Sequence, residues 1–313
     1  MPSEDNPSLD ARRQAAQLAF IASNAPLKVG DLAATPFDID DLRGPQPRHA
    51  ELRMDGGLSA VVMRLNAGGR LWTLKQARTE ARVRNVDGQT AFLNEIQRRI
   101  DHAELKRRDP GRWQGLVDTA WGSWRDGLLL SPWIEGEPVK AWDERQLGQL
   151  FELACNLWLE GLFEWDLSTD NVLDDGRQIR LFDFGYQYRF DPRTQFSSAG
   201  HGDDEPLFHP AERFESRCIS GHLLMLEQQS GADAALAAFR REKAVALEAY
   251  GRMRPARRPR GAPRPTCWTG STASSTAGPR RCGAMRQPCT WPRTGARMCW
   301  TSTTTCAAKA ARH

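Results

Sequence analysis

The chain's charge is divided between two parts of very different composition. Its 313 residues include 43 Lys and Arg against 39 Asp and Glu, a formal net charge of +4. Residues 251–313 contain 12 Arg and one Lys, with no Asp, Glu, Leu, Ile, Val, Phe or Tyr, so residues 1–250 carry a net charge of −9. So few core-forming residues exclude independent folding of the basic tail, whereas residues 1–250 are long enough for one large domain or two small ones.

Residues 1–250 also lack the features of membrane and secreted proteins. The longest apolar runs, such as residues 128–130, are too short to span a bilayer. The first residues contain acidic side chains and no apolar stretch, so no signal peptide is expected. Of seven cysteines only Cys155 and Cys218 precede residue 251, which argues against a disulfide framework. We therefore expect a cytoplasmic protein without a membrane span.

The first elements predicted are one helix and a group of short strands. Residues 12–22 have the composition of a helix, and residues 24–47, rich in Pro, Asp and Gly, predict a connecting segment. Three partly β-branched stretches bounded by glycines follow, at residues 49–54, 59–65 and 71–75. Gly56-Gly57 separates the first pair, and residues 66–69 separate the second pair as a hairpin turn should.

A helix, a buried strand and a longer helix are expected next. Asp87 or Thr90 can cap the first helix, whose apolar residues recur at helical spacing: Phe92, Leu93, Ile96 and Ile100. The apolar run at residues 127–134 predicts a buried strand. The clearest helical stripe of the chain follows, formed by Leu147, Leu150, Phe151, Ala154, Leu157, Trp158 and Gly161.

The last predicted elements are two short strands, a loop and two helices. The strands are expected at residues 171–173 and 179–182, with Asp174-Asp175-Gly176 as the turn between them. A long polar loop at residues 186–209 precedes helices at 220–228 and 233–250. This order predicts an α+β fold in which a small sheet-containing part precedes a mainly helical part.

The densest cluster of polar residues lies between residues 165 and 185. Asp166 and Asn171 are five residues apart just past the long helix, and Asp183 follows twelve residues after Asn171 at the end of a predicted strand. Mg²⁺ prefers such oxygen ligands and is usually held by one or two carboxylates together with substrate phosphates. A carboxylate left off the metal could orient a hydroxyl nucleophile.

This segment resembles the catalytic and metal-binding loops of the protein kinase-like superfamily, whose pattern is D-x-x-x-x-N followed by D-F-G. The other parts of the pattern occur in the expected order: a glycine-containing loop at 55–62, Lys75 in the third strand, Glu95 in the next helix, a hinge at 129–136, and His-Pro-Ala-Glu-Arg at 209–213. The resemblance covers residues 50 to 250. It implies a two-lobed fold, with an N-terminal extension at 1–45, a β-rich lobe at 46–130 and a mainly helical lobe at 131–250.

The resemblance implies transfer of the γ-phosphoryl group of Mg·ATP to a hydroxyl group. Asp166 would orient the attacking hydroxyl, while Asn171 and Asp183 would hold Mg²⁺ across the phosphates. Lys75 would contact the α- and β-phosphates, and Glu95 would hold Lys75 in place. The residues implied to bind the nucleotide are Gly56, Gly57, Ser59, Val62, Lys75 and Trp133.

The acceptor implied by the resemblance is a hydroxyl-bearing protein or small molecule, with a protein Ser or Thr favoured. A sugar, lipid or antibiotic kinase is one alternative, and a pseudokinase that only binds nucleotide is another. Taken singly, Lys75 and Glu95 could also be an exposed ion pair, and Asp183 could cap a turn. The net charge of −9 over residues 1–250 gives no support to a nucleic-acid partner.

The chain departs from the superfamily pattern at three places. Asp55 and Ala60 stand where the phosphate loop would have its flanking glycines. Trp165, rather than Arg, precedes Asp166, so we expect no need for activation-loop phosphorylation. Ser168 replaces the Lys common in serine/threonine kinases, which leaves one γ-phosphate contact missing.

The basic tail at residues 251–313 allows three interpretations. Its arginines could bind phosphate groups of nucleic acid or anionic membranes, and its five cysteines could suggest a metal site, although no C-x-x-C pair occurs among them. Abundant Arg, Pro, Ala, Gly, Thr, Trp and Cys without aliphatic residues is also what an out-of-frame reading of GC-rich DNA would give. The sequence favours this third interpretation, a disordered or frameshifted segment.

Overall fold

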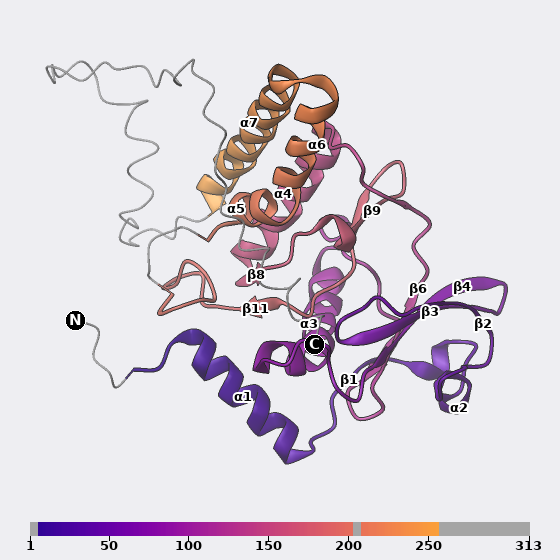
Figure 1. Ribbon diagram of the computed structural model, residues 1–313. Coiled ribbons are helices and arrows are strands. Elements are labelled where there is room, and N and C mark those ends of the chain that lie inside the picture. The colour runs from indigo at the N-terminus through magenta and orange to yellow at the C-terminus, as the bar shows by residue number, and fades with distance from the viewer. Residues whose placement is uncertain (1–5, 203–207, 257–313) are drawn as a thin grey trace, which may run out of the picture. The chain divides into compact units, whose positions relative to one another are not determined.

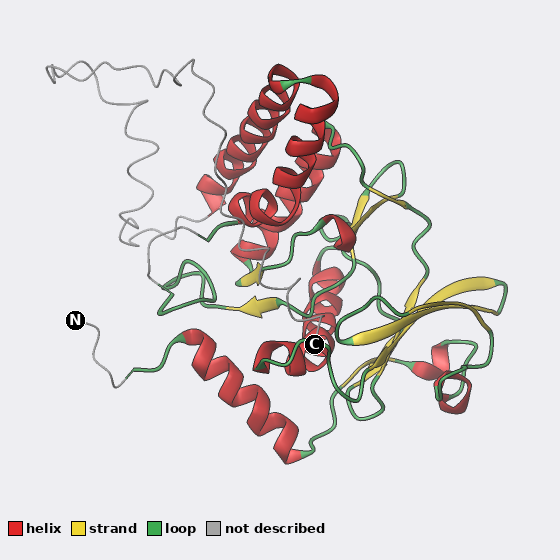
Figure 2. Ribbon diagram, viewed as in Figure 1, coloured by secondary structure: helices red, strands yellow, loops and turns green. Residues whose placement is uncertain are grey.

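The computed structural model describes residues 6–202 and 208–256 (Figure 1). These residues form an α+β fold with a β-rich N-terminal region and helices later in the chain (Figure 2). That arrangement confirms the coarse fold class expected from the sequence. Of the basic tail expected at residues 251–313, residues 251–256 belong to the last helix of the structure, so the disorder expected for the tail does not begin at residue 251. Residues 257–313 lie outside the described residues.

A six-stranded antiparallel sheet dominates the N-terminal region. Its order is β1 (Lys28–Gly30), β5 (Trp121–Ser123), β6 (Leu128–Pro132), β4 (Arg70–Ala77), β3 (Ala60–Ala67) and β2 (Ala50–Met54). The predicted strands β2, β3, β4 and β6 are confirmed. The short strands β1 and β5, which pair through Lys28 and Ser123, were not predicted, because three residues are too few to display a period of two.

One face of this sheet is covered by the segment expected to be a mere connection. Residues 24–47 contain β1, the 3₁₀ helix η1 (Leu32–Ala34) and the short helix α2 (Ile39–Leu42). Phe37 and Leu42 are buried in one apolar cluster with the sheet residues Met63 and Leu74. Leu32 and Ile39 also pack against this cluster. The segment's Pro, Asp and Gly content conceals these contacts, because its apolar residues follow no helical or strand period.

The opposite face of the sheet packs against helix α3 (Val86–Arg108). Phe92 and Ile96 of α3 share an apolar cluster with Leu129 of β6. Because side chains alternate between the two faces of a strand, Leu74 points to the first face and Lys75 points to α3. The helix begins after Asn85, which is its N-cap because its side chain accepts a hydrogen bond from the Gly88 amide. The predicted N-caps, Asp87 and Thr90, are therefore wrong.

Helix α1 (Leu9–Ser23) confirms the helix predicted at residues 12–22 and lies against α3. Its Gln17 is buried, accepts a hydrogen bond from Thr90 Oγ1 at 2.9 Å and donates one to Asn94 Oδ1 at 3.4 Å. Arg13 donates to Asp87 Oδ1 at 2.9 Å. These polar contacts make α1 part of the same core as α3.

The later helices form a second group (Figure 1). They are α4 (Glu144–Leu159), α5 (Pro210–Phe214), the π-helix η3 (Glu215–Ile219), α6 (Ser220–Ser230) and α7 (Ala232–Ala256). The predicted stripe of α4 is buried, and its Phe151 meets Phe214 edge to face with ring centroids 5.4 Å apart. Gly161, which follows α4, has φ +75°, and a Cβ there would lie 2.4 Å from the Phe190 carbonyl oxygen, so this chain reversal requires glycine.

Two small antiparallel sheets carry the polar segment at residues 165–185. Strands β9 (Val172–Asp174) and β10 (Ile179–Leu181) form the predicted hairpin, with β7 (Glu137–Pro138) beside β9. Strand β8 (Leu162–Glu164) pairs with β11 (Gln187–Arg189), which lies in the stretch predicted to be a polar loop. The short 3₁₀ helix η2 (Thr169–Asn171) connects the two sheets.

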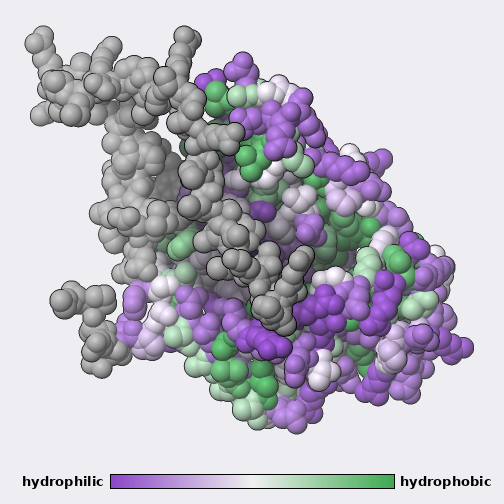
Figure 3. Space-filling view, viewed as in Figure 1, coloured by the Kyte–Doolittle hydropathy of each residue, from purple (hydrophilic) through white to green (hydrophobic). Residues whose placement is uncertain are grey.

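Ten large hydrophobic side chains are exposed on the described surface, and half of them lie on α6 and α7: Leu224, Met225, Leu236, Phe239 and Leu247. Figure 3 shows a face on which hydrophilic residues predominate and hydrophobic ones are interspersed. Among residues 6–202 and 208–256, no helix combines the length and hydropathy needed to cross a bilayer.

Candidate functional site

The structure brings Lys75 into direct contact with both Glu95 and Asp183. Lys75 Nζ of β4 lies 2.8 Å and 3.0 Å from the two Glu95 carboxylate oxygens and 3.1 Å from Asp183 Oδ2. The side chains of Lys75 and Glu95 are 7% and 1% exposed, and that of Asp183 is 39% exposed. The alternative of an exposed Lys75–Glu95 pair is therefore wrong, since both charges are buried between the sheet and α3.

Electrostatics favour the charged forms of Lys75 and Asp183. Burial acts to lower the pKa of Lys75, but the carboxylates of Asp183 and Glu95 outweigh it and raise that pKa above its ordinary value. Burial likewise acts to raise the pKa of Asp183, but the Lys75 ammonium outweighs it and holds that pKa below its ordinary value. An ammonium and a carboxylate therefore stand side by side at the open edge of the site.

Asp166 and Asn171 form a second contact pair. Asn171 Nδ2 donates to the Asp166 backbone carbonyl at 2.9 Å and to Asp166 Oδ2 at 3.0 Å. The buried Glu164 accepts a hydrogen bond from the Asp166 amide at 3.0 Å, and burial raises the pKa of Glu164 well above its ordinary value. The loop that carries Asp166 is thus fixed from both sides.

The β9–β10 hairpin brings the two contact pairs toward each other. Val172 pairs with Leu181, and the Phe182 amide donates to the Asn171 carbonyl at 3.3 Å. Asn171 and Asp183 therefore leave the same end of the hairpin. Asp183 also accepts from the Gly185 amide at 3.2 Å, so the turn role considered for it is real and coexists with the Lys75 contact.

The donor set fits Mg²⁺ held jointly with phosphates. Because Asn171 Nδ2 is committed to Asp166, the Asn171 Oδ1 atom remains as a ligand oxygen, and the ionised Asp183 supplies the carboxylate. No cluster of three His, Cys, Asp or Glu that could hold a metal alone occurs in the described ranges. One carboxylate and one amide match an ion that keeps waters and binds substrate phosphates.

The glycine-containing loop lies between β2 and β3. Val62 of β3 is paired with Lys75 in the sheet register, and the Ser59 carbonyl accepts from the Arg78 amide at 2.9 Å. Arg78 also donates to the carbonyls of Asp55 and Gly57, at 2.8 Å and 3.0 Å, and forms an ion pair with the Asp55 carboxylate. Arg78 therefore neutralises the carboxylate that stands where the superfamily pattern has glycine.

The two loop glycines differ in what surrounds them. A Cβ on Gly57 would lie 2.4 Å from the Ala60 carbonyl oxygen, whereas a Cβ on Gly56 would meet nothing within 4 Å. We expect Gly57→Ala to lower the free energy of unfolding by about 1 to 2 kcal/mol through this clash, and Gly56→Ala to leave it unchanged. Urea denaturation of both variants tests this, and equal stabilities would contradict it.

Trp133 lies apart from Lys75 and its carboxylate partners. Lys75 is paired with Leu129 of β6, and Trp133 follows four residues later, about 13 Å along an extended chain. The Arg64 guanidinium lies 5.5 Å from the centre of the Trp133 ring. Among the described residues, Trp133 and the loop residues Gly56, Gly57 and Ser59 form no hydrogen bond or ion pair with the Lys75 group.

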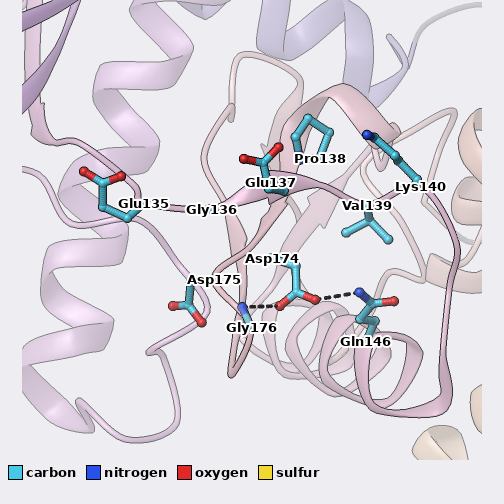
Figure 4. A pocket seen from close by; sticks show the side chains of 10 residues that line it. All are labelled: Glu135, Gly136, Glu137, Pro138, Val139, Lys140, Gln146, Asp174, Asp175 and Gly176. Atoms are coloured by element: carbon cyan, nitrogen blue, oxygen red, sulfur yellow. Dashed lines mark hydrogen bonds between the residues drawn. The ribbon is translucent and has the colours of Figure 1, made fainter.

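A shallow pocket of about 470 Å³ lies beside strand β7 and the turn between β9 and β10 (Figure 4). It is lined by residues 135–140 together with Gln146 and the turn Asp174–Gly176. Asp174 accepts from Gln146 Nε2 and from the Gly176 amide, and it pairs with Arg145. The Asp174 carboxylate therefore stabilises the turn between β9 and β10, which the sequence predicts.

Two arginines in the site were not predicted. Arg99 donates to Glu95 Oε1 at 2.9 Å and to the Phe182 carbonyl at 2.8 Å, and its spacing of four residues from Glu95 on one helix was a usable signal. Arg217 of η3 donates to Asp166 Oδ1 from Nε at 3.0 Å and from a terminal nitrogen at 2.6 Å. No sequence pattern links Arg217 to Asp166, because the two residues are 51 positions apart.

Comparison with known proteins adds no assignment. No protein-family model matches the chain, and no curated protein matches it.

Proposed function

We propose that the chain is a phosphotransferase of the protein kinase-like superfamily that moves the γ-phosphoryl group of Mg·ATP to a hydroxyl acceptor. The observation that carries the proposal is the buried Lys75–Glu95 pair in contact with Asp183, next to the bonded pair of Asp166 and Asn171. Lys75 would neutralise nucleotide phosphates, and Asn171 and Asp183 would hold Mg²⁺. Asp166 would orient the acceptor hydroxyl.

The arrangement suits a reaction that depends on positioning and charge neutralisation. Phosphoryl transfer needs the attacking oxygen, the metal and the cations in fixed places. In the proposed two-lobed fold, residues 46–130 would supply Lys75, Glu95 and the phosphate loop, and residues 131–250 would supply Asp166, Asn171 and Asp183. A protein Ser or Thr is the acceptor that we favour, and a small molecule is the alternative.

Nucleotide binding and phosphoryl transfer are measured separately to test this proposal. We expect Mg-dependent ATP binding by calorimetry and formation of ADP and a phosphorylated product in cell extract. Asp183→Ala should weaken Mg-dependent binding, and Asp166→Ala should lower the transfer rate about a hundredfold or more while nucleotide binding persists.

The matched control for these variants is Asp40→Ala, which removes a largely exposed carboxylate of α2. Its nucleotide binding and transfer rate should equal those of the original chain. Equal transfer in all four proteins would refute the proposal. Nucleotide binding without transfer by the original chain would instead identify a binding module of the pseudokinase type.

A further inference from the structure

A cation from a distant part of the chain is bonded to the proposed catalytic carboxylate. The two nitrogens of Arg217 that contact Asp166 both donate to the same oxygen, Oδ1. The Arg217 side chain is 49% exposed, and that of Asp166 is 24% exposed. The described contacts of Arg217 use Nε and one terminal nitrogen, so the second terminal nitrogen keeps two hydrogens for a ligand.

Arg217 is held in place by the segment around it. Three contacts join residues 213–218 to the loop at 165–169: Arg213 Nε to the Trp165 carbonyl at 3.2 Å, Arg217 to Asp166, and Cys218 Sγ to Thr169 Oγ1 at 3.1 Å. Cys218 and Ile219 are buried, which anchors η3 to the core. Single π-helical turns occur frequently at functional sites. The position of Arg217 beside Asp166 is therefore built into the fold.

The hydrogen-bonding capacity of Asp166 is compatible with a hydroxyl acceptor. Arg217 occupies Oδ1 with two hydrogen bonds, while Oδ2 accepts only the Asn171 amide among its described contacts and keeps a lone pair for a hydroxyl. Lys75 already directs its three hydrogens to Glu95 and Asp183. A second cation on the acceptor side would stabilise the negative charge that the oxygens of the transferring phosphoryl group carry.

We propose that Arg217 is this second cation, which contacts the transferred phosphoryl group directly while its bond to Asp166 holds that carboxylate in orientation. The inference rests on the proposed function. In the step, the acceptor oxygen bonds to the γ-phosphorus, and the bond to the β–γ bridging oxygen breaks with its electron pair leaving on ADP. The hydroxyl proton passes to Asp166 Oδ2 and then to solvent, and Arg217 stays protonated throughout.

Mg·ADP with aluminium fluoride tests the contact without knowledge of the acceptor, because the planar fluoride mimics the phosphoryl group in transfer. Calorimetry gives the dissociation constant of Mg·ADP with and without aluminium fluoride. For Arg217→Gln we expect an unchanged Mg·ADP constant, within twofold, and a loss of tenfold or more in the affinity gained from aluminium fluoride. Arg217→Lys should keep part of that gain, and the exposed Arg241→Gln on α7 should keep all of it.

Each result decides the inference. If aluminium fluoride raises the Mg·ADP affinity of Arg217→Gln as much as that of the original chain, the inference is overturned and the proposed function stands. The same holds if the original chain binds Mg·ADP but aluminium fluoride does not raise that affinity. Failure of the original chain to bind Mg·ADP overturns both. Asp166→Ala separates direct from indirect action: it should keep most of the gain if Arg217 contacts the phosphoryl group. An equal loss in Asp166→Ala and Arg217→Gln would show that Arg217 acts only through Asp166.

Discussion

Replacing Glu95 with alanine is expected to lower the free energy of unfolding by about 3 to 5 kcal/mol, because it leaves two buried cations without their shared anion. Glu95 Oε1 lies 2.8 Å from Lys75 Nζ and 2.9 Å from Arg99, and the side chains of Lys75 and Arg99 are 7% and 2% exposed. Urea denaturation monitored by circular dichroism measures the loss.

Glu104→Ala is the matched control on the same helix. Glu104 pairs with Arg107 at 2.7 Å, but both side chains are more than half exposed, so its removal should leave the unfolding free energy unchanged. Lys75→Met in the Glu95→Ala background should cost less than the sum of the two single changes, because it removes one of the stranded cations. Equal losses in Glu95→Ala and Glu104→Ala would contradict the burial of the Lys75–Glu95 pair.

Replacing Glu242 with glutamine is expected to stabilise the protein above neutral pH. Glu242 of α7 is fully buried, and neither carboxylate oxygen accepts a hydrogen bond, although Lys243 Nζ lies 3.3 Å away and itself pairs with Glu215. Burial raises the pKa of Glu242 to about 7, from an ordinary value of 4.5. The folded protein therefore keeps this proton over a pH range in which the unfolded chain has lost it.

The sign of the pH effect follows from that difference. Below pH 4.5 Glu242 is protonated in both the folded and the unfolded chain and does not lower the free energy of unfolding. As the pH rises to about 7 its burial lowers the free energy of unfolding, by about 3 kcal/mol at that pH. Unfolding free energies measured from pH 4.5 to 8.5 should diverge between the original chain and Glu242→Gln as the pH rises. Glu248→Gln, which changes an exposed carboxylate on α7, should follow the original curve. Parallel curves for all three would refute the prediction.

Long periodic elements could be predicted from the sequence, whereas of the three-residue strands only β9 and β10 could, because the turn Asp174-Asp175-Gly176 marks their hairpin. The seven-residue stripe of α4 and the glycine-bounded strands β3 and β4 are readable because each repeats its pattern several times. Strands β1, β5, β8 and β11 have three residues each, and they form because partners distant in sequence supply their hydrogen bonds. Their pairing is a tertiary effect that no local window contains.

The same distinction holds for the candidate site. Lys75 and Glu95 were predicted as partners from the resemblance, and the structure brings them into contact. What the sequence could not supply was their environment: the burial of the pair, the ion pair between Arg78 and Asp55, and the approach of Arg217. Each of these depends on chain segments that meet only in the folded protein.

The position of α1 has a consequence for the order in which the protein assembles during synthesis. The first turn of this helix is fixed by Gly200, whose carbonyl accepts from the Leu9 amide at 2.6 Å and whose amide donates to Asp10 Oδ2 at 3.1 Å. The ribosome therefore releases α1 long before residue 200 exists to receive it. Contacts so distant in sequence form late in folding. Although α1 is the first helix to be synthesised, we expect it to be among the last to dock.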